Sequence, residues 1–108
     1  MSNTNACVVM TTAPSKEVAE NLARAVLGAR LAACVQIQQI ESHYWWDGKI
    51  TSDAEQLLYF KTTRDHYAAL EQAILRDHPY DTPEIIMLPI EAGSRKYLDW
   101  IARETKAG

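Results

Sequence analysis

The 108-residue chain contains few of the residues that interrupt or cross-link a fold: four Gly, four Pro and two Cys. Cys7 and Cys34 lie in apolar segments without C-x-x-C spacing, so we expect reduced, packed thiols rather than a structural disulfide. With 47% hydrophobic and 23% charged residues, the composition excludes a collagen-like or disordered chain. The length suits one hydrophobic core, and we expect a single domain over residues 1–108.

Long apolar runs and an excess of positive charge are also missing. No stretch approaches the roughly 20 apolar residues of a bilayer span, and residues 1–6 lack the basic and apolar pattern of a secretory signal. The net charge is −3, from 11 basic and 14 acidic residues. No element gathers Lys and Arg on one face, as binding to a phosphate backbone requires, so we expect no nucleic acid partner. Because the bilayer span and the secretory pattern are missing, we expect a cytoplasmic protein with no membrane partner.

Catalytic motifs are absent as well. The sequence has no glycine-rich phosphate loop and no G-x-S-x-G elbow, and the turn at residues 11–14 lacks the arginine and glycines of an acyl-phosphate site. Asp53 and Glu55 alternate along one strand face, where a solvated stripe is favoured over half of an acid site because no second pair opposes them. We expect no enzymatic activity.

The apolar periodicity predicts seven elements in the order strand, helix, strand, strand, helix, strand, helix. Their expected ranges are residues 6–10, 15–28, 33–46, 49–62, 63–78 and 85–90, with a last helix opening at 93–94. Ser15 and Thr63 are the expected caps of the first two helices. The order matches an α+β, ferredoxin-like split βαβ sandwich, with two helices on one face of an antiparallel four-stranded sheet and an extra C-terminal helix.

Asp47-Gly48 predicts a long β-hairpin between the second and third strands. Asp-Gly supplies the positive φ angles of a type I′ turn, whose twist suits antiparallel strands. A two-residue turn then pairs apolar with apolar residues at both ends of the hairpin: Trp45 with Ile50, Ile37 with Leu58, and Val35 with Phe60. The middle, residues 39–43 against 52–56, is polar on both faces, so its register is weakly specified and open to a bulge.

Three predicted strands are apolar on both faces, which a half-solvated antiparallel sheet does not tolerate. They include residues 7–10, 57–60 and 85–88. The hairpin reaches beyond a small domain, at roughly 3.3 Å per residue, and its tip exposes Tyr44, Trp45 and Trp46 unless a partner covers them. Another copy of the chain is the simplest cover, so we expect self-assembly with these three residues at the interface.

Of the three histidines, His43, His66 and His78, no two share the spacing of metal ligands on one helix face. His43 and His66 are interpreted as solvated polar residues. His78 lies beside Asp77 at a helix terminus, where an imidazole and a carboxylate are able to face one ion. A helix-end histidine that bonds the last carbonyls is the alternative, and it stays open.

Lys61, Tyr80 and Glu84 are polar residues that border buried segments. They are candidates for the lining of an intersubunit pocket, with partly buried surface residues as the open alternative.

Six segments, in order and over nearly the whole chain, resemble the divalent-cation tolerance (CutA) family. They are Leu31-Ala32-Ala33-Cys34-Val35, Tyr44-Trp45-Trp46-Asp47-Gly48-Lys49-Ile50, Lys61-Thr62-Thr63, His78-Pro79-Tyr80, Thr82-Pro83-Glu84-Ile85 and Tyr97-Leu98-Asp99-Trp100. The resemblance implies a ferredoxin-like fold, a stable homotrimer with a PII-like arrangement of subunits, and a response to metal ions. Copper and other divalent cations are the implied ligands.

Family members with a proposed copper site have a cysteine and a pair of histidines. At the positions that match these ligands by resemblance, this chain has Thr11, Asp77 and His78. Only His78 keeps the original ligand type, so the resemblance implies weak copper or divalent-cation binding through His78 and Asp77. The alternative function is a PII-like regulator that binds a small effector in intersubunit clefts near Lys61, Tyr80 and Glu84.

Overall fold

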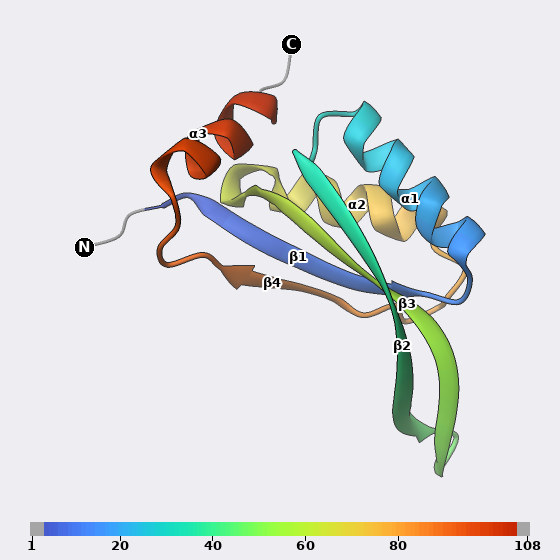
Figure 1. Ribbon diagram of the computed structural model, residues 1–108. Coiled ribbons are helices and arrows are strands. Elements are labelled where there is room, and N and C mark those ends of the chain that lie inside the picture. Colours follow the sequence, from blue (N-terminus) through green and yellow to red (C-terminus); the bar gives the residue numbers. More distant parts are fainter. Residues whose placement is uncertain (1–3, 106–108) are drawn as a thin grey trace.

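Four antiparallel strands form one sheet in the order β2-β3-β1-β4 in a computed structural model, which describes residues 4–105. The strands are β1 (Ala6–Ala13), β2 (Cys34–Trp46), β3 (Lys49–Thr63) and β4 (Ile85–Pro89), and the helices are α1 (Lys16–Gly28), α2 (Tyr67–Asp77) and α3 (Arg95–Glu104). Helices α1 and α2 cover one face of the sheet, and α3 lies at the end far from the hairpin tip (Figure 1). The predicted ferredoxin-like order with an extra C-terminal helix is confirmed.

Two of the three expected helix starts are capped by serine. Ser15 Oγ accepts a hydrogen bond from Val18 N at 3.2 Å, and Ser94 caps α3 in the same way. The expected Thr63 cap is wrong: the Thr63 hydroxyl is hydrogen-bonded to His66 Nδ1 at 2.7 Å. A 3-10 turn, η1 (Arg64–His66), therefore precedes α2.

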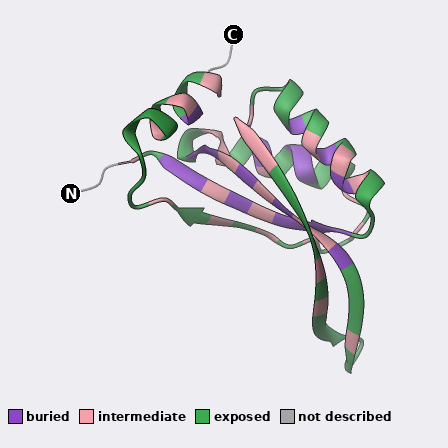
Figure 2. Ribbon diagram, in the orientation of Figure 1, coloured by how far each residue is buried: buried purple, intermediate pink, exposed green. Residues whose placement is uncertain are grey.

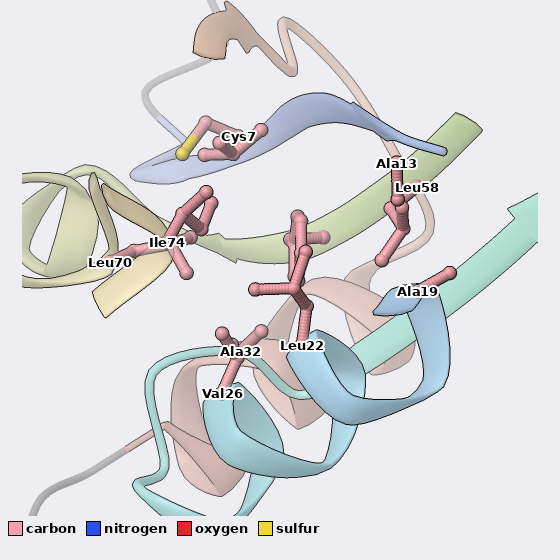
Figure 3. Packing of buried hydrophobic residues seen from close by; sticks show 11 residues of the cluster. Cys7, Ala13, Ala19, Leu22, Val26, Ala32, Leu58, Leu70 and Ile74 are labelled. Atoms are coloured by element: carbon pink, nitrogen blue, oxygen red, sulfur yellow. The ribbon is translucent and has the colours of Figure 1, made fainter. Parts of the chain in front are cut away.

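The core lies between the sheet and helices α1 and α2. Leu22 and Val26 of α1 and Leu70 and Ile74 of α2 point at β1 and β3, and all four side chains are buried (Figure 3). Full burial of one such aliphatic side chain contributes about 1.5–3 kcal/mol. Cys7 of β1 is a free thiol in this layer, and its burial raises its pKa.

The hairpin has the predicted register over its whole length. Its pairs run without a bulge from Cys34 opposite Lys61 to Trp46 opposite Lys49, through the polar middle. Asp47 and Gly48 both have positive φ, 52° and 74°, as a type I′ turn requires. The turn fixes the register because a two-residue loop determines which residues of the two strands pair with each other.

The outer half of the hairpin extends beyond the rest of the sheet. Strand β1 pairs with β3 only as far as Gln56, so the hairpin is a two-stranded ribbon from there to its tip (Figure 1). Figure 2 shows most of this ribbon exposed, with buried and intermediate residues where it leaves the sheet and intermediate ones farther along it. Trp45 and Ile50, which pair across it, are 72% and 69% exposed.

The sheet face away from α1 and α2 is only partly covered. Ile85 and Met87 of β4 pack on the core, whereas the alternate residues Ile86 and Leu88 are exposed. Strand β4 is therefore apolar on both faces, as predicted. Among the described residues, none of the helices has the length and apolarity needed to cross a bilayer.

Candidate functional site

A cleft opens between the base of the overhanging hairpin and the loop of residues 78–84 that joins α2 to β4. We call it the hairpin cleft, and its volume is about 790 Å³. Its lining residues are Thr12, Ser42, His43, Tyr44, Trp45, Trp46, Glu55, Pro79, Tyr80, Asp81, Thr82 and Glu84.

His78 holds the loop against the end of β1. Helix α2 ends at Asp77 because His78 precedes a proline and has an extended backbone. Its Nδ1 accepts a hydrogen bond from Tyr80 N at 3.1 Å, so Nε2 carries the proton that is donated to Thr12 O at 2.6 Å. Both ring nitrogens of His78 are thus engaged, and the ring positions Tyr80, whose centroid lies 4.8 Å away.

Tyr80 reaches across the cleft to a buried carboxylate on β3. Its hydroxyl donates to Glu55 Oε2 at 2.7 Å, and Glu55 is only 7% exposed. Desolvation, followed by the hydrogen bond to Glu55, raises the pKa of Tyr80. A phenol and a carboxylate therefore form one wall of the cleft, with the tyrosine held protonated.

A second pair of the same kind lies farther along the hairpin. The Tyr44 hydroxyl donates to Asp53, and this hydrogen bond is the main reason that the pKa of Tyr44 is raised. The continuous register places Tyr44, Asp53 and Glu55 on the same face of the hairpin, because β-strand side chains alternate. Both acid–phenol pairs consequently face one side.

The cleft combines negative charge with aromatic surface. Glu55, Asp81 and Glu84 line it, and within residues 4–105 its lining includes neither Lys nor Arg. Of the ion pairs found within residues 4–105, only the one between His43 and Glu41 includes a lining residue, and its carboxylate partner lies outside the lining. Carboxylates and aromatic faces both attract cations, so the chemistry of this cleft favours a positively charged ligand.

The structure brings some of the predicted site residues together and separates others. Tyr80 and Glu84 line the same cleft as Tyr44, Trp45 and Trp46. Lys61 does not, because it lies near the opposite end of β3, where its Nζ is 5.7 Å from the centroid of the Tyr97 ring.

The candidate metal ligands have different surroundings. Asp77 is exposed, with Oδ1 3.6 Å from Arg76 Nε. Thr11 is fully buried on the helix side of the sheet, and His78 meets the carbonyl of the next residue, Thr12. Over the described ranges, no three or more His, Cys, Asp or Glu side chains cluster as a metal site. Metal binding through His78 and Asp77 stays a prediction.

Glu55 is the functional residue that sequence reasoning missed. The expectation of a solvated acidic stripe is wrong at this position, because Tyr80 and the loop cover the Glu55 carboxylate. The predicted hairpin register puts Asp53 diagonally opposite Tyr44, on the strand face that also carries Glu55. This acid–phenol pairing across the strands is the signal in the sequence that points to the site. Burial of Glu55 depends on a loop that is 25 residues away in sequence, which no strand pattern encodes.

The split βαβ sheet, its overhanging hairpin and this acidic cleft define a ferredoxin-like α+β protein with an acidic, aromatic cleft beside the hairpin. The family described as CutA1 divalent ion tolerance protein matches residues 7–104. The chain belongs to this family, as the sequence resemblance predicts.

Two curated relatives and one solved structure illustrate the similarity. A Yersinia pestis (strain Pestoides F) protein named divalent-cation tolerance protein CutA is 45% identical over 102 residues, which are 94% of this chain and 86% of that protein. Chloroplastic protein CutA 1 of Oryza sativa subsp. japonica is 46% identical over 100 residues, covering 92% of this chain but only 56% of the rice protein. The Archaeoglobus fulgidus structure, named periplasmic divalent cation tolerance protein CutA, has a TM-score of 0.92 and 39% identity and covers 94% of this chain and 99% of its own.

Proposed function

We propose that the protein is a non-catalytic homotrimer that acts in the cellular response to divalent cations. The observation that carries this proposal is the exposed apolar tip of the hairpin, where Trp45 and Ile50 pair on one face. Contiguous exposed aromatic and aliphatic surface marks an interface in soluble proteins. A trimer with a PII-like arrangement gives each tip a neighbouring subunit to pack on.

Light scattering tests the assembly. The wild-type protein is expected at three chain masses, and Trp45→Ala should shift the equilibrium toward monomer, because truncation of a buried aromatic anchor weakens an interface. Leu27→Ala, which shortens a 39% exposed leucine on α1, is the matched control and should leave the mass unchanged. A wild-type monomer at every concentration would contradict the proposal.

We assign divalent-cation binding to His78 and Asp77, with weak affinity. Engagement of His78 by a metal ion displaces one of its two hydrogen bonds, to Thr12 O or from Tyr80 N, and that loss opposes binding. Calorimetry with copper on wild type, His78→Ala and Asp77→Asn tests the ligands. Asp77→Asn is the informative variant because the exposed Asp77 carboxylate, within residues 4–105, has Arg76 as its only ion-pair partner. Isotherms unchanged in both variants would refute the assignment.

A cytosolic location is part of the proposal. Its support is the pair of free cysteines, Cys7 and Cys34, since unpaired thiols are typical of reducing compartments. Fractionation of cells that express the chain should recover it with cytosolic markers, and recovery in the periplasmic or membrane fraction would contradict this location.

A second candidate function is a regulator that binds a small effector. The hairpin cleft favours it, because about 790 Å³ is the size of small-molecule sites and Tyr80 and Glu84 both line the cleft. A ligand that binds the native state raises its stability. A thermal-shift screen of nucleotides, organic anions and organic amines tests this function, and absence of stabilisation by any class would count against it.

A further inference from the structure

We propose that the ligand of the hairpin cleft is a small aliphatic amine in its protonated form. The inference rests on the second candidate function, that the cleft binds an effector, and it names the chemical class of that effector. Amines of this class are cations at neutral pH, because alkylammonium groups titrate near pH 10.

Glu55 is a carboxylate that is largely removed from water. The residue is 7% exposed, and its hydrogen-bond partner within residues 4–105 is the neutral hydroxyl of Tyr80, which donates to Oε2. A carboxylate that is removed from water without a cation loses hydration that a single phenol does not replace. None of the ion pairs found across residues 4–105 includes Glu55 or Asp53. The cleft therefore has a buried negative charge that a cationic ligand would neutralise.

The two acid–phenol pairs have a spacing that suits two ammonium groups. Asp53 and Glu55 are two residues apart on one strand face, which separates them by roughly 6.6 Å at 3.3 Å per residue. Glu55 lines the cleft, whereas Asp53 is exposed at its edge and is hydrogen-bonded to the lining residue Tyr44. Each carboxylate accepts from a tyrosine, Tyr44 or Tyr80, whose oxygen remains free to accept from an N–H group. A short diamine, with one ammonium group at Glu55 in the cleft and the other at the Tyr44–Asp53 pair at its edge, matches this arrangement.

Aromatic side chains form a further part of the cleft wall. Tyr44, Trp46 and Tyr80 line the cleft together with the carboxylates of Glu55, Asp81 and Glu84. Aromatic faces attract ammonium groups and cover the methylene chain between them. A bare metal ion gains nothing from this apolar surface, and the His, Cys, Asp and Glu side chains in the described part of the chain form no cluster of three or more ligands. Anionic effectors are disfavoured because the lining found within residues 4–105 presents carboxylates and neither Lys nor Arg.

The proposed interface and the ligand site share Trp45 but are otherwise on different faces of the hairpin. Trp45 and Ile50 pair on one face, whereas Tyr44, Asp53 and Glu55 share the other face. Because Trp45 also contributes to the lining of the cleft, Glu55→Gln rather than Trp45→Ala is the variant that tests ligand binding.

Calorimetry with putrescine, in amine-free cacodylate buffer at pH 7, tests the proposal on the assembled protein. We expect a saturable isotherm for wild type. Glu55→Gln should weaken binding at least about tenfold, because the amide still accepts from Tyr80 but carries no charge. Glu91→Gln removes an exposed carboxylate outside the cleft and should bind as wild type does. Butylamine, with one ammonium group, should bind more weakly than putrescine.

Several outcomes would overturn the proposal. One is no saturable heat with putrescine, and another is equal affinity in wild type and Glu55→Gln. Displacement of putrescine by MgCl₂ with the same dependence on Glu55 would assign the carboxylates to a metal ion. Dissociation of the trimer by Glu55→Gln, seen by light scattering, would mean that a partner subunit supplies the cation. If putrescine does not bind but another class of small molecule stabilises the protein in the thermal-shift screen, the effector function is supported and only the assignment of an amine is wrong.

Discussion

Thr11 has a buried hydroxyl that forms no hydrogen bond within the described residues. Thr11→Val keeps the shape of the side chain and removes the unpaired oxygen. We expect the variant to raise the free energy of unfolding by about 1 kcal/mol, because an unsatisfied buried hydroxyl is destabilising. Urea denaturation at one fixed protein concentration measures the change.

Thr62 is the matched control on the neighbouring strand. It is also fully buried on the helix side of the sheet, but its Oγ1 donates to Leu31 O at 2.7 Å. Thr62→Val should therefore lower the free energy of unfolding by about 1 kcal/mol. Equal losses at both positions would show that Thr11 has a partner after all.

Tyr80 makes stability depend on pH in the alkaline range. Its pKa is raised in the folded protein above the ordinary value of 10.0. The native state therefore keeps this proton at a pH where the unfolded chain has released it. The Tyr80 contribution is fully present below about pH 10 and is lost as the pH rises through the folded pKa.

The free energy of unfolding should consequently fall less steeply above pH 10 in Tyr80→Phe than in wild type. Lysines titrate in the same range in both proteins, so the difference between the two curves isolates the phenol. Denaturant unfolding between pH 8 and 11.5 measures it. Parallel curves would contradict the hydrogen bond between Tyr80 and Glu55.

At the scale of the element, the hairpin turn depends on the left-handed backbone at Gly48. Its φ is 74°, and a Cβ added there meets no atom within 4 Å, so strain is the only obstacle to a side chain. Gly48→Ala should destabilise the protein by about 1 kcal/mol. Gly28, the last residue of α1, is equally open but lacks positive φ. Gly28→Ala should instead stabilise by about 0.5 kcal/mol, as thermal unfolding would show.

Local signals accounted for most of the fold. The Asp47-Gly48 turn predicts the register of the whole hairpin, because strand pairing propagates from a turn of fixed length. The order of the elements follows from their apolar periods. Strand β1 runs to Ala13, three residues beyond the apolar run that predicted it, because β3 supplies hydrogen-bonding partners as far as Gln56.

The candidate site was less predictable because distant contacts build it. The loop with Tyr80 is fixed by His78, which bonds a carbonyl 66 residues earlier in the chain. Sequence patterns report the neighbours of a residue along the chain, so they predict that Tyr80 and Glu84 border a buried segment but do not predict the burial of Glu55. They also place Lys61 with Tyr80 and Glu84, because it too borders a buried segment, whereas the structure places Lys61 beside Tyr97.

At the scale of the whole molecule, the open sheet face should be covered by another subunit. Leu88 on this face is 48% exposed, and Leu75 on α2 is 44% exposed. We expect Leu88→Lys to dissociate the proposed trimer, because a charge in a desolvated interface has no partner there. Leu75→Lys, at nearly the same exposure in the single chain, should leave the mass unchanged by light scattering. Dissociation by both variants or by neither would remove this face from the interface.

The overhanging hairpin also makes the thermal stability of the protein depend on its concentration. Beyond Gln56 the ribbon has no third strand, and an isolated two-stranded ribbon is at best marginally stable in water. Neighbouring subunits would supply the missing support, so dilution should cost the molecule stability by mass action. We expect the midpoint of thermal unfolding to rise with protein concentration. A midpoint that is constant over a hundredfold range would show that the hairpin is stable in the single chain.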